Sequence, residues 1–396
     1  MVISLINMDH FDFLLFENYH IAVNHKYDVV LIARLLQHAG MKVGIVDIYH
    51  EDNINEISGI PVIHLKCVDK IPNDYWILHP KNKLHSLLCL IRFLYQQHFY
   101  MRKVKQEIEN LADYFYCGSY HTAMPFIFFY SKKECYYWGL RSSRMTDFWS
   151  HFKQNPLLAF RMLMLRSAFK RNPSQKLFVS NAIIKTEFEK LGIPNNRMVI
   201  REERCLESSD GPHYEALEKQ CTFLAIGKLR PDKRVEMTIE AFQQISKKSD
   251  VKLFLIGAAH PKYEQMLQSM YISDNAILRD NSYLDYCKFN DYIRRSHFVV
   301  FADKQQLSSV TNGTMLEALI NYRPIIAPNY DPYKFYVNKY GIGLLYDPME
   351  AGDLERVLVR AVQLGCSFFY ENIDRYVKSI SFDRVSSDLY NAIIGH

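Results

Sequence analysis

The sequence predicts an α/β protein of two domains, each built on a doubly wound parallel sheet. Strand-like and helix-like segments alternate along the chain, and the alternation is interrupted once, at residues 202–220. The length of 396 residues suits two or three domains, and a composition of 48% hydrophobic and 23% charged residues allows large buried cores. We therefore expect a first domain at residues 1–205 and a second at residues 206–374.

The first half begins with a strand, a helix and a strand. "VISLIN" (2–7) and "KVGIVDI" (42–48) have the composition of buried strands, and "YDVVLIARLLQHAG" (27–40) has helical periodicity and ends at Gly40 in the C-cap position. This order predicts parallel strands. Four further short strands are expected at "PVIHL" (61–65), "DYFYCGS" (113–119), "ECYYWGL" (134–140) and "KLFVSN" (176–181).

The second half repeats the alternation after a polar segment with Gly-Pro, which we interpret as the interdomain connection. The expected strands are "TFLAIG" (222–227), "VKLFLIG" (251–257), "AILRD" (276–280), "HFVVFA" (297–302) and "RPIIAP" (323–328). The expected helices are "RVEMTIEAFQQISKK" (234–248), "PKYEQMLQSM" (261–270), "LDYCKFNDYIRRS" (284–296) and "TMLEALINY" (314–322). We expect the two domains to face each other across a cleft, because ligands of such sheets bind outside the carboxyl ends of the strands.

The cysteines and the apolar runs indicate where the chain resides. None of the eight cysteines forms a C-x-x-C pair, and several lie in apolar runs, which favours buried free thiols in a reducing compartment over a zinc site or a disulfide framework. No stretch reaches 18 consecutive apolar residues, and the N-terminus lacks the basic region of a signal peptide. We therefore expect a cytoplasmic protein.

Positive charge is concentrated in one part of the chain. Residues 81–200 hold 19 Lys and Arg against 7 Asp and Glu, a net +12, while the remaining residues hold 29 against 36, a net −7. Within this part, residues 81–105 and 157–172 combine helical apolar spacing with flanking basic residues, which is typical of helices on an anionic membrane surface. The alternative is that their apolar faces pack inside the first domain. No nucleic-acid recognition motif accompanies the charge, so we expect no nucleic acid partner.

A cluster of cations follows the first strand of the second domain. In "AIGKLRPDKRVEMTIEAF" (225–242), a strand ends at a glycine and a short basic loop precedes a helix. The cations of this loop are Lys228, Arg230, Lys233 and Arg234. Positive side chains beside the N-terminus of a helix suit a diphosphate. The alternative is an ordinary solvated basic loop.

The segment "SSVTNGTMLEALINYRPIIAP" (308–328) places a carboxylate beside the start of a helix. Gly313 allows the backbone to approach a ligand closely, and the first N–H groups of the helix near Thr314 are unpaired and carry partial positive charge. A phosphate-sized anion therefore fits beside Asn312 and Gly313. Glu317 then needs another task, and its two acceptor oxygens suit the vicinal hydroxyls of a ribose. The alternative is an ordinary exposed helix glutamate.

These two segments resemble motifs of the GT-B-fold glycosyltransferases of the large family 4 type. That family carries G-R-L-x-x-x-K-G after a strand, and this chain has "GKLRPDKR", with Lys228 and Lys233 at the matching places. The family also carries E-G-F-G-x-x-x-x-E-A-M-A-x-G-x-P-V-[IV]-A, and this chain has "SVTNGTMLEALINYRPIIA", with Glu317 at the second glutamate. The similarity spans about residues 175–365, whereas the first 170 residues match only in their βαβ pattern.

The resemblance implies two Rossmann-like domains with the donor site in the second, and a last helix, about residues 375–396, that crosses back to the first domain. The residues implied to hold the donor are Lys228 and Lys233 for the diphosphate, Glu317 for the ribose, the backbone of Asn312, Gly313 and Thr314 for the phosphates and sugar, and Arg279 and Asn281 at the place where such folds read the base.

Two departures from the family pattern concern catalysis. Ser309 stands where the family has the first glutamate of its motif, which normally touches the transferred sugar, and segment 135–143 lacks the histidine that the family often has in the comparable strand. An inverting enzyme then needs another base. His10, Asp12 and His121 follow predicted strands, and we favour His121 and Asp12, although a lone histidine is more often structural. A retaining enzyme needs no such base, because the leaving phosphate can take the proton.

The sequence thus predicts a glycosyltransferase that moves a hexose or related sugar from a nucleoside diphosphate donor to a glycan or lipid-linked saccharide, in the synthesis of cell-surface polysaccharide or glycoconjugates. No Asp-x-Asp follows a predicted strand, and lysines with a helix dipole can neutralise the leaving diphosphate, so we expect neither a metal nor another cofactor. The alternative is a catalytically inactive protein of this fold that binds a nucleotide sugar or a glycan. A dinucleotide-dependent dehydrogenase is excluded because the chain has no G-x-G-x-x-G.

Overall fold

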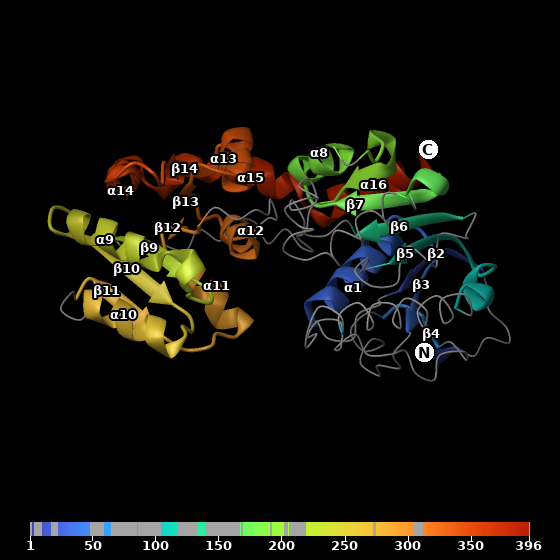
Figure 1. Ribbon diagram of the computed structural model, residues 1–396, viewed down its shortest axis with the longest axis horizontal. Helices are drawn as coiled ribbons and strands as arrows, with labels where there is room; N and C mark the ends of the chain where they lie inside the picture. Colours follow the sequence, from blue (N-terminus) through green and yellow to red (C-terminus); the bar gives the residue numbers. More distant parts are fainter. Residues whose placement is uncertain are drawn as a thin grey trace. The chain divides into compact units, whose positions relative to one another are not determined.

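The computed structural model divides into two compact units, Met1–Glu203 with Phe382–His396, and Arg204–Ser381 (Figure 1). Each unit is built on one sheet. The structure describes residues 2–3, 10–16, 23–47, 59–64, 85, 104–117, 133–138, 167, 169–190, 192–201, 205, 219–271, 275–304 and 312–395.

The first unit contains a parallel sheet of eight described strands in the order β1-β4-β3-β2-β5-β6-β7-β8. The strands are β1 (Val2–Ile3), β2 (Phe11–Phe16), β3 (Val43–Asp47), β4 (Val62–His64), β5 (Ala112–Cys117), β6 (Glu134–Trp138), β7 (Gln175–Val179) and β8 (Met198–Ile200). The helices that the structure describes by their bounds are α1 (Val23–His38), α8 (Ala182–Lys190), the 3-10 helix η4 (Asn195–Arg197) and α16 (Phe382–Ile394).

The central strand of this sheet corrects one expectation. Of segment 2–7 the structure describes Val2–Ile3, which form β1 at the edge of the described sheet, whereas β2 precedes helix α1 and pairs with both β3 and β5. Phe13, Leu14 and Leu15 of β2 are completely buried. A continuous apolar run is typical of a strand covered on both faces, and "FDFLLF" is such a run, interrupted only by Asp12. The amino edge of the sheet therefore lies at residues 10–12.

Helix α16, near the C-terminus of the chain, packs on helix α1 of the first unit. The buried hydroxyl of Ser386 donates to the backbone carbonyl of Leu35 in α1 at 2.6 Å. The preceding helix α15 (Tyr370–Ser379) belongs to the second unit, so the chain passes from one unit to the other between Ser381 and Phe382.

The second unit contains a parallel sheet of six described strands in the order β11-β10-β9-β12-β13-β14. The strands are β9 (Cys221–Ile226), β10 (Val251–Ile256), β11 (Ile277–Asp280), β12 (Phe298–Val300), β13 (Ile325–Pro328) and β14 (Gly343–Tyr346). The helices are η5 (Pro231–Lys233), α9 (Val235–Ser246), α10 (Pro261–Tyr271), α11 (Tyr286–Arg294), α12 (Gly313–Ile320), α13 (Tyr333–Tyr340), α14 (Asp353–Leu364), η6 (Cys366–Phe369) and α15. The two parallel sheets with interleaved helices confirm the predicted α/β class with two doubly wound domains.

The core of the second unit limits where polar side chains can lie in its sheet. Leu224 of β9, Leu253 of β10 and Val299 of β12 are completely buried, because both faces of these inner strands are covered. Polar side chains at the middle of this sheet therefore occur mainly where the strands end. The carboxyl ends of β9 and β12, which are neighbours in the sheet, bring two such loops together.

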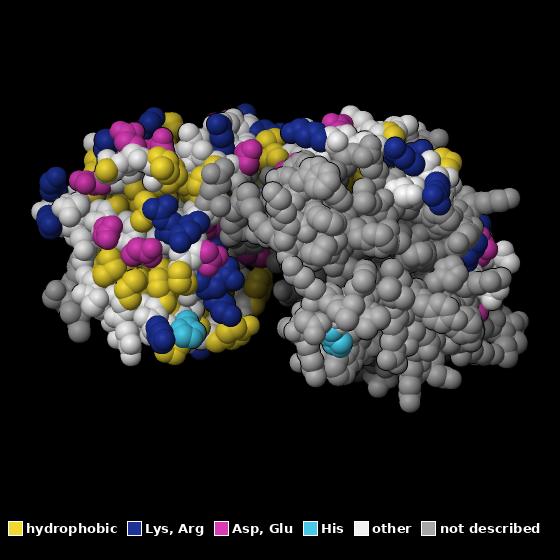
Figure 2. Space-filling view, viewed as in Figure 1, with side chains coloured by type: hydrophobic (Ala, Val, Ile, Leu, Met, Phe, Trp, Pro, Cys, Tyr) yellow, Lys and Arg dark blue, Asp and Glu magenta, His cyan; other side chains and the backbone are white. Residues whose placement is uncertain are grey.

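The two segments expected to bind a membrane, 81–105 and 157–172, lie mostly outside the described residues. On the face of the second unit shown in Figure 2, Lys and Arg side chains are interspersed with acidic ones. No helix in the described part of the chain is long and apolar enough to cross a membrane.

Candidate functional site

The carboxyl end of strand β9 leads directly into the basic loop. Gly227 follows the strand with a φ of 114°, in the left-handed region that favours glycine. Leu229 is buried and anchors the loop in the core, while Lys228 and Arg230 on either side of it are exposed. This alternation holds cationic side chains at the carboxyl edge of the sheet.

A pocket of about 170 Å³ lies where this loop meets the ends of β12 and α12. Its lining residues are Ala225, Ile226, Gly227, Lys228, Leu229, Arg230, Lys233, Val235, Thr238, Val300, Phe301, Ala302, Asp303, Asn312 and Thr314. A Cβ atom at Gly227 would lie 3.7 Å from Thr314 Oγ1, so the two predicted segments approach each other closely. The structure thus brings Lys228, Lys233, Asn312 and Thr314 into one pocket.

The start of helix α12 lies at this pocket. Asn312 is the N-cap, and its Oδ1 accepts a hydrogen bond from the backbone N–H of Thr314 at 3.0 Å. Gly313 is exposed, and nothing lies within 4 Å of the position that a Cβ atom would take there. The first turn therefore offers an anion both the partial positive charge of a helix N-terminus and space to approach.

The four cations of the loop differ in their partners. Lys233 Nζ lies 2.8 Å from Asp303 Oδ2, and Arg230 pairs with the aspartate two residues further on at 2.9 Å. Lys228 and Arg234 form no ion pair with any described residue. Lys228 is exposed, so its ammonium group can reach a bound anion. Lys233 is three-quarters buried, and an ammonium carries three donors, so two remain beyond the one directed at Asp303.

Glu317 lies one turn inside helix α12 and is only 6% exposed. This burial excludes the alternative of an ordinary exposed helix glutamate. The phenol of Tyr286, at the start of α11, donates to Glu317 Oε2 at 3.1 Å, and Tyr286 itself is largely exposed. A ligand that hydrogen-bonds to Glu317 therefore meets Tyr286 beside it.

Tyr286 and Asp303 were not among the residues predicted from the sequence. Neither belongs to a motif. The only signal for Asp303 is that it is the first charged residue after the buried run "FVVFA" of strand β12, and that the carboxyl end of an inner parallel strand is a position where ligands bind.

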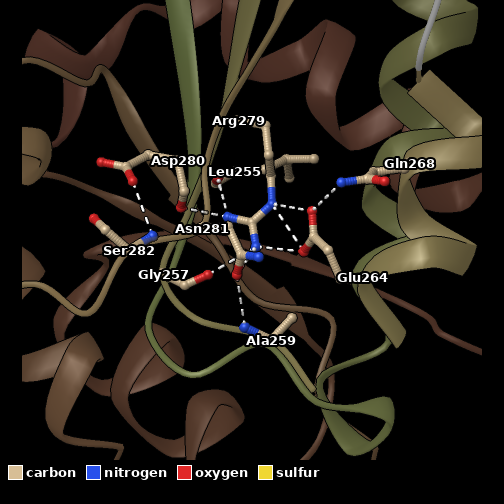
Figure 3. Close-up of polar contacts among 9 residues, drawn as sticks. All are labelled: Leu255, Gly257, Ala259, Glu264, Gln268, Arg279, Asp280, Asn281 and Ser282. Carbon is tan, nitrogen blue, oxygen red and sulfur yellow. Dashed lines mark hydrogen bonds and ion pairs between the residues drawn. The ribbon is translucent and has the colours of Figure 1, made fainter. Parts of the chain in front are cut away.

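Arg279 supports the ends of two strands (Figure 3). Its guanidinium forms a buried ion pair with Glu264 at 2.6 Å and donates to the carbonyl oxygens of Leu255, Gly257 and Asp280. It also donates to Asn281 Oδ1, which in turn accepts from the backbone N–H of Ala259. All the N–H groups of Arg279 are thus engaged within the protein, and the geometry supports a structural role for it in place of the expected contact with a base. Asn281 is exposed beside this network, and it remains a predicted contact for the base.

The residues of the first unit that were proposed as catalytic bases lie at the amino end of its sheet or outside the described part of the chain. Asp12 is the second residue of β2, at the amino end of the sheet, and its Oδ2 accepts from the backbone N–H of Lys42 at 2.6 Å. His10 lies at the same edge, with Nε2 3.1 Å from Asp113 Oδ2. The expectation that His10 and Asp12 lie at the carboxyl end of a strand is wrong, because β2 begins at Phe11 and both residues lie at its amino end, whereas ligands bind at the carboxyl end. His121 lies outside the described residues.

Comparison with known proteins agrees with this site. Residues 220–363 match the family model described as glycosyl transferases group 1, and this range includes the pocket and Glu317. A search of curated protein sequences gives no significant match. The family match and the solved structures together confirm the resemblance to the GT-B glycosyltransferases.

The similar solved structures extend the comparison to nearly the whole chain. HepE of Anabaena in complex with UDP superimposes with a TM-score of 0.68 at 12% identity, covering 97% of this chain and 100% of that one. The lipopolysaccharide outer core galactosyltransferase WaaB gives 0.64 at 12% identity, with 97% and 99% covered. Sucrose-phosphate synthase from Thermosynechococcus elongatus gives 0.63 at 13% identity, with 97% and 99% covered. At this identity the likeness shows a shared GT-B fold.

Proposed function

We propose that the chain is a glycosyltransferase that uses a nucleoside diphosphate sugar as donor. The observation that carries this proposal is a single pocket at the carboxyl ends of β9 and β12, lined by Lys228, Lys233 and the N-terminus of α12, with buried Glu317 one turn further along the helix. These groups match the two parts of a nucleoside diphosphate, because cations and helix N–H groups suit phosphates while a carboxylate suits the ribose hydroxyls. HepE, a similar structure, was solved with UDP.

The residues of this chain have separate tasks in the reaction. The bond from the anomeric carbon to the phosphate oxygen breaks, a new bond forms to the acceptor hydroxyl, and negative charge accumulates on the leaving diphosphate. Lys228 and the positive N-terminus of α12 at Gly313 stabilise that charge, which is the role of preorganised electrostatic groups in a transferase. The acceptor proton passes to a phosphate oxygen in a retaining reaction or to a base such as His121 in an inverting one.

The first unit is proposed to bind the acceptor, a glycan or a lipid-linked saccharide of the cell surface. The net charge of +12 in residues 81–200 supports binding at an anionic membrane surface, at the cytoplasmic face, through segments 81–105 and 157–172. The likeness in fold to a lipopolysaccharide outer core galactosyltransferase agrees with this choice of acceptor and with transfer of a hexose.

A second candidate is a nucleotide-sugar-binding protein without catalytic activity. Ser309, in place of the first motif glutamate, favours it. Release of the nucleoside diphosphate separates the two candidates. The chain is incubated with UDP-, GDP- and ADP-sugars and with lipid-linked or soluble glycans, and the freed diphosphate is measured. A transferase releases diphosphate with one donor class and only when an acceptor is present. A binding protein releases none, although it binds the donor.

A further inference from the structure

Asp303 connects the two halves of the donor pocket through one oxygen atom. It lies three residues beyond the end of β12, lines the pocket and is only 6% exposed. Its Oδ2 is 2.8 Å from Lys233 Nζ, accepts from the phenol of Tyr333 at 2.6 Å and accepts from Asn312 Nδ2 at 3.2 Å. The three donors come from the basic loop, from helix α13 and from the N-cap of α12.

The phenol of Tyr333 is a permanent donor in this cluster. Burial, followed by the nearby Asp303 carboxylate, raises the pKa of Tyr333 well above its ordinary value, so the hydroxyl stays protonated over the working pH range. Tyr333 also accepts a hydrogen bond from Asn312 Nδ2 at 2.7 Å. Its ring lies in the core of the second unit, 2% exposed, and this fixes the direction of the donated hydrogen bond.

The cluster also orients the start of helix α12. The amide of Asn312 directs Nδ2 at Asp303 and Tyr333, so Oδ1 faces the backbone N–H of Thr314. An amide turned the other way would place its carbonyl oxygen against the carboxylate, which is unfavourable. Asp303 therefore acts on the helix N-terminus and on Lys233 at the same time.

A buried carboxylate in a pocket for phosphates opposes the ligand by charge repulsion. Lys233 neutralises the charge of Asp303. The same ion pair holds the flexible side chain of Lys233 in the pocket before a ligand binds. Ordering such a side chain in advance lowers the entropic cost of binding. Asp303 Oδ1 makes no hydrogen bond with any described residue, so one Asp303 oxygen performs the anchoring.

We infer that Asp303 is a positioning residue of the donor site, which holds Lys233 and the N-cap Asn312 in the arrangement that receives a nucleoside diphosphate. This inference rests on the proposed function. The Asp303 carboxylate favours binding by anchoring Lys233 and Asn312 more than it opposes binding by repelling the ligand. Removal of the Asp303 charge therefore weakens binding.

The test measures the dissociation constants of UDP, GDP and ADP by calorimetry for the whole chain and for Asp303→Asn. The variant keeps the shape and one acceptor oxygen but loses the ion pair. We expect about tenfold weaker binding of whichever diphosphate the wild type binds best, since hydrogen bonds to charged groups have effects of this size. In a Lys233→Met background the same substitution should weaken binding clearly less than tenfold, because the part of its effect that passes through Lys233 is then lost and only the part that passes through Asn312 remains.

Asp232→Asn is the matched control. It removes a charge from the same loop, where Asp232 pairs with Arg230 rather than with Lys233, and it is expected to leave binding unchanged or slightly tighter. Tyr333→Phe provides a second variant if Asp303→Asn does not fold, with about threefold weaker binding expected because the carboxylate loses its shortest hydrogen bond.

Equal or tighter binding by the Asp303 and Tyr333 variants would overturn the inference and leave the proposed function intact. An undiminished effect of Asp303→Asn in the Lys233→Met background would also overturn it, because a merely structural role does not depend on Lys233. Failure of the wild type to bind any of the three diphosphates would contradict the proposed function itself, and the inference with it.

Discussion

The two sheets of this protein are both parallel, but their ends carry different chemistry. In the second unit, the loops at the carboxyl ends of β9 and β12 form a pocket with Lys228, Lys233 and the start of α12. In the first unit, the acidic residue suggested as a base, Asp12, lies at the amino end of β2 and holds a backbone N–H. In a parallel sheet the end of the strand decides whether a polar residue meets a ligand, so a candidate must be assigned to an end before it is assigned a role.

The largest effect is expected on stability, from replacing Arg279, a candidate for ligand binding whose contacts lie within the fold. Arg279→Met should lower the free energy of unfolding by about 3 kcal/mol, because it leaves Glu264 buried without its partner. Urea unfolding measures this effect. Arg295→Met is the control, since its ion pair with Asp291 is half exposed and should contribute less than about 1 kcal/mol. Equal losses in the two variants would contradict the assigned role of Arg279.

A smaller effect is expected from the exposed cation of the pocket. Lys228→Ala should weaken binding of the preferred nucleoside diphosphate about tenfold at low salt and less at high salt, because an exposed ammonium is screened. Calorimetry at two salt concentrations measures this. Lys247→Ala removes another exposed lysine, at the C-cap of α9, and should leave the affinity unchanged. If Lys247→Ala has the same effect, the attraction comes from the net charge of the unit and not from the pocket.

A still smaller effect is expected at the amino end of the first sheet. Asp12→Ala should leave turnover unchanged and reduce the stability by about 1 kcal/mol, the typical contribution of one hydrogen bond such as that to the backbone N–H of Lys42. Initial rates and urea unfolding of the same preparation report both quantities. A loss of activity of a hundredfold or more in the folded variant would restore Asp12 as a catalytic base and break the comparison between the two sheets.

No effect is expected from metal removal. Lys228 and the N-terminus of α12 supply positive charge to the diphosphate, so the affinity for the preferred nucleoside diphosphate should be the same with EDTA and with Mg²⁺. Calorimetry in the two buffers measures this. A tenfold weaker affinity in EDTA would show that a divalent cation takes part in binding.

The second unit was predictable from sequence in both its fold and part of its site. Its inner strands are continuous apolar runs between polar loops, and the spacing of Lys228 and Lys233 places both on the loop after β9. Glu317 was predictable because a carboxylate one turn into an apolar helix needs a partner. The structure pairs Lys233 with Asp303 and Glu317 with Tyr286. In each pair the two residues come from elements distant in the sequence. Their contact depends on the order of the strands and not on any local sequence pattern.

The first unit was less predictable because no sequence motif marks the ends of its strands. The interruption of "FDFLLF" by Asp12 concealed strand β2, and segment 2–7 was expected to be the strand that precedes the first helix. That error shifted His10 and Asp12 to the wrong end of the sheet. Arg279 illustrates a different limit, since an arginine at a strand end has the same local signature whether it binds a ligand or the backbone carbonyl oxygens of its own sheet.

The central claim is that the pocket of the second unit binds a nucleoside diphosphate sugar with Glu317 on the ribose. A thermal-shift screen of the wild type and of Glu317→Ala against UDP-, GDP-, ADP- and CMP-sugars tests it most directly, since a ligand that binds the folded state raises the melting temperature by mass action. The account predicts a shift with one class of nucleoside diphosphate sugar, and a much smaller shift in the variant. Equal shifts for the wild type and Glu317→Ala, or no shift with any donor, would contradict it.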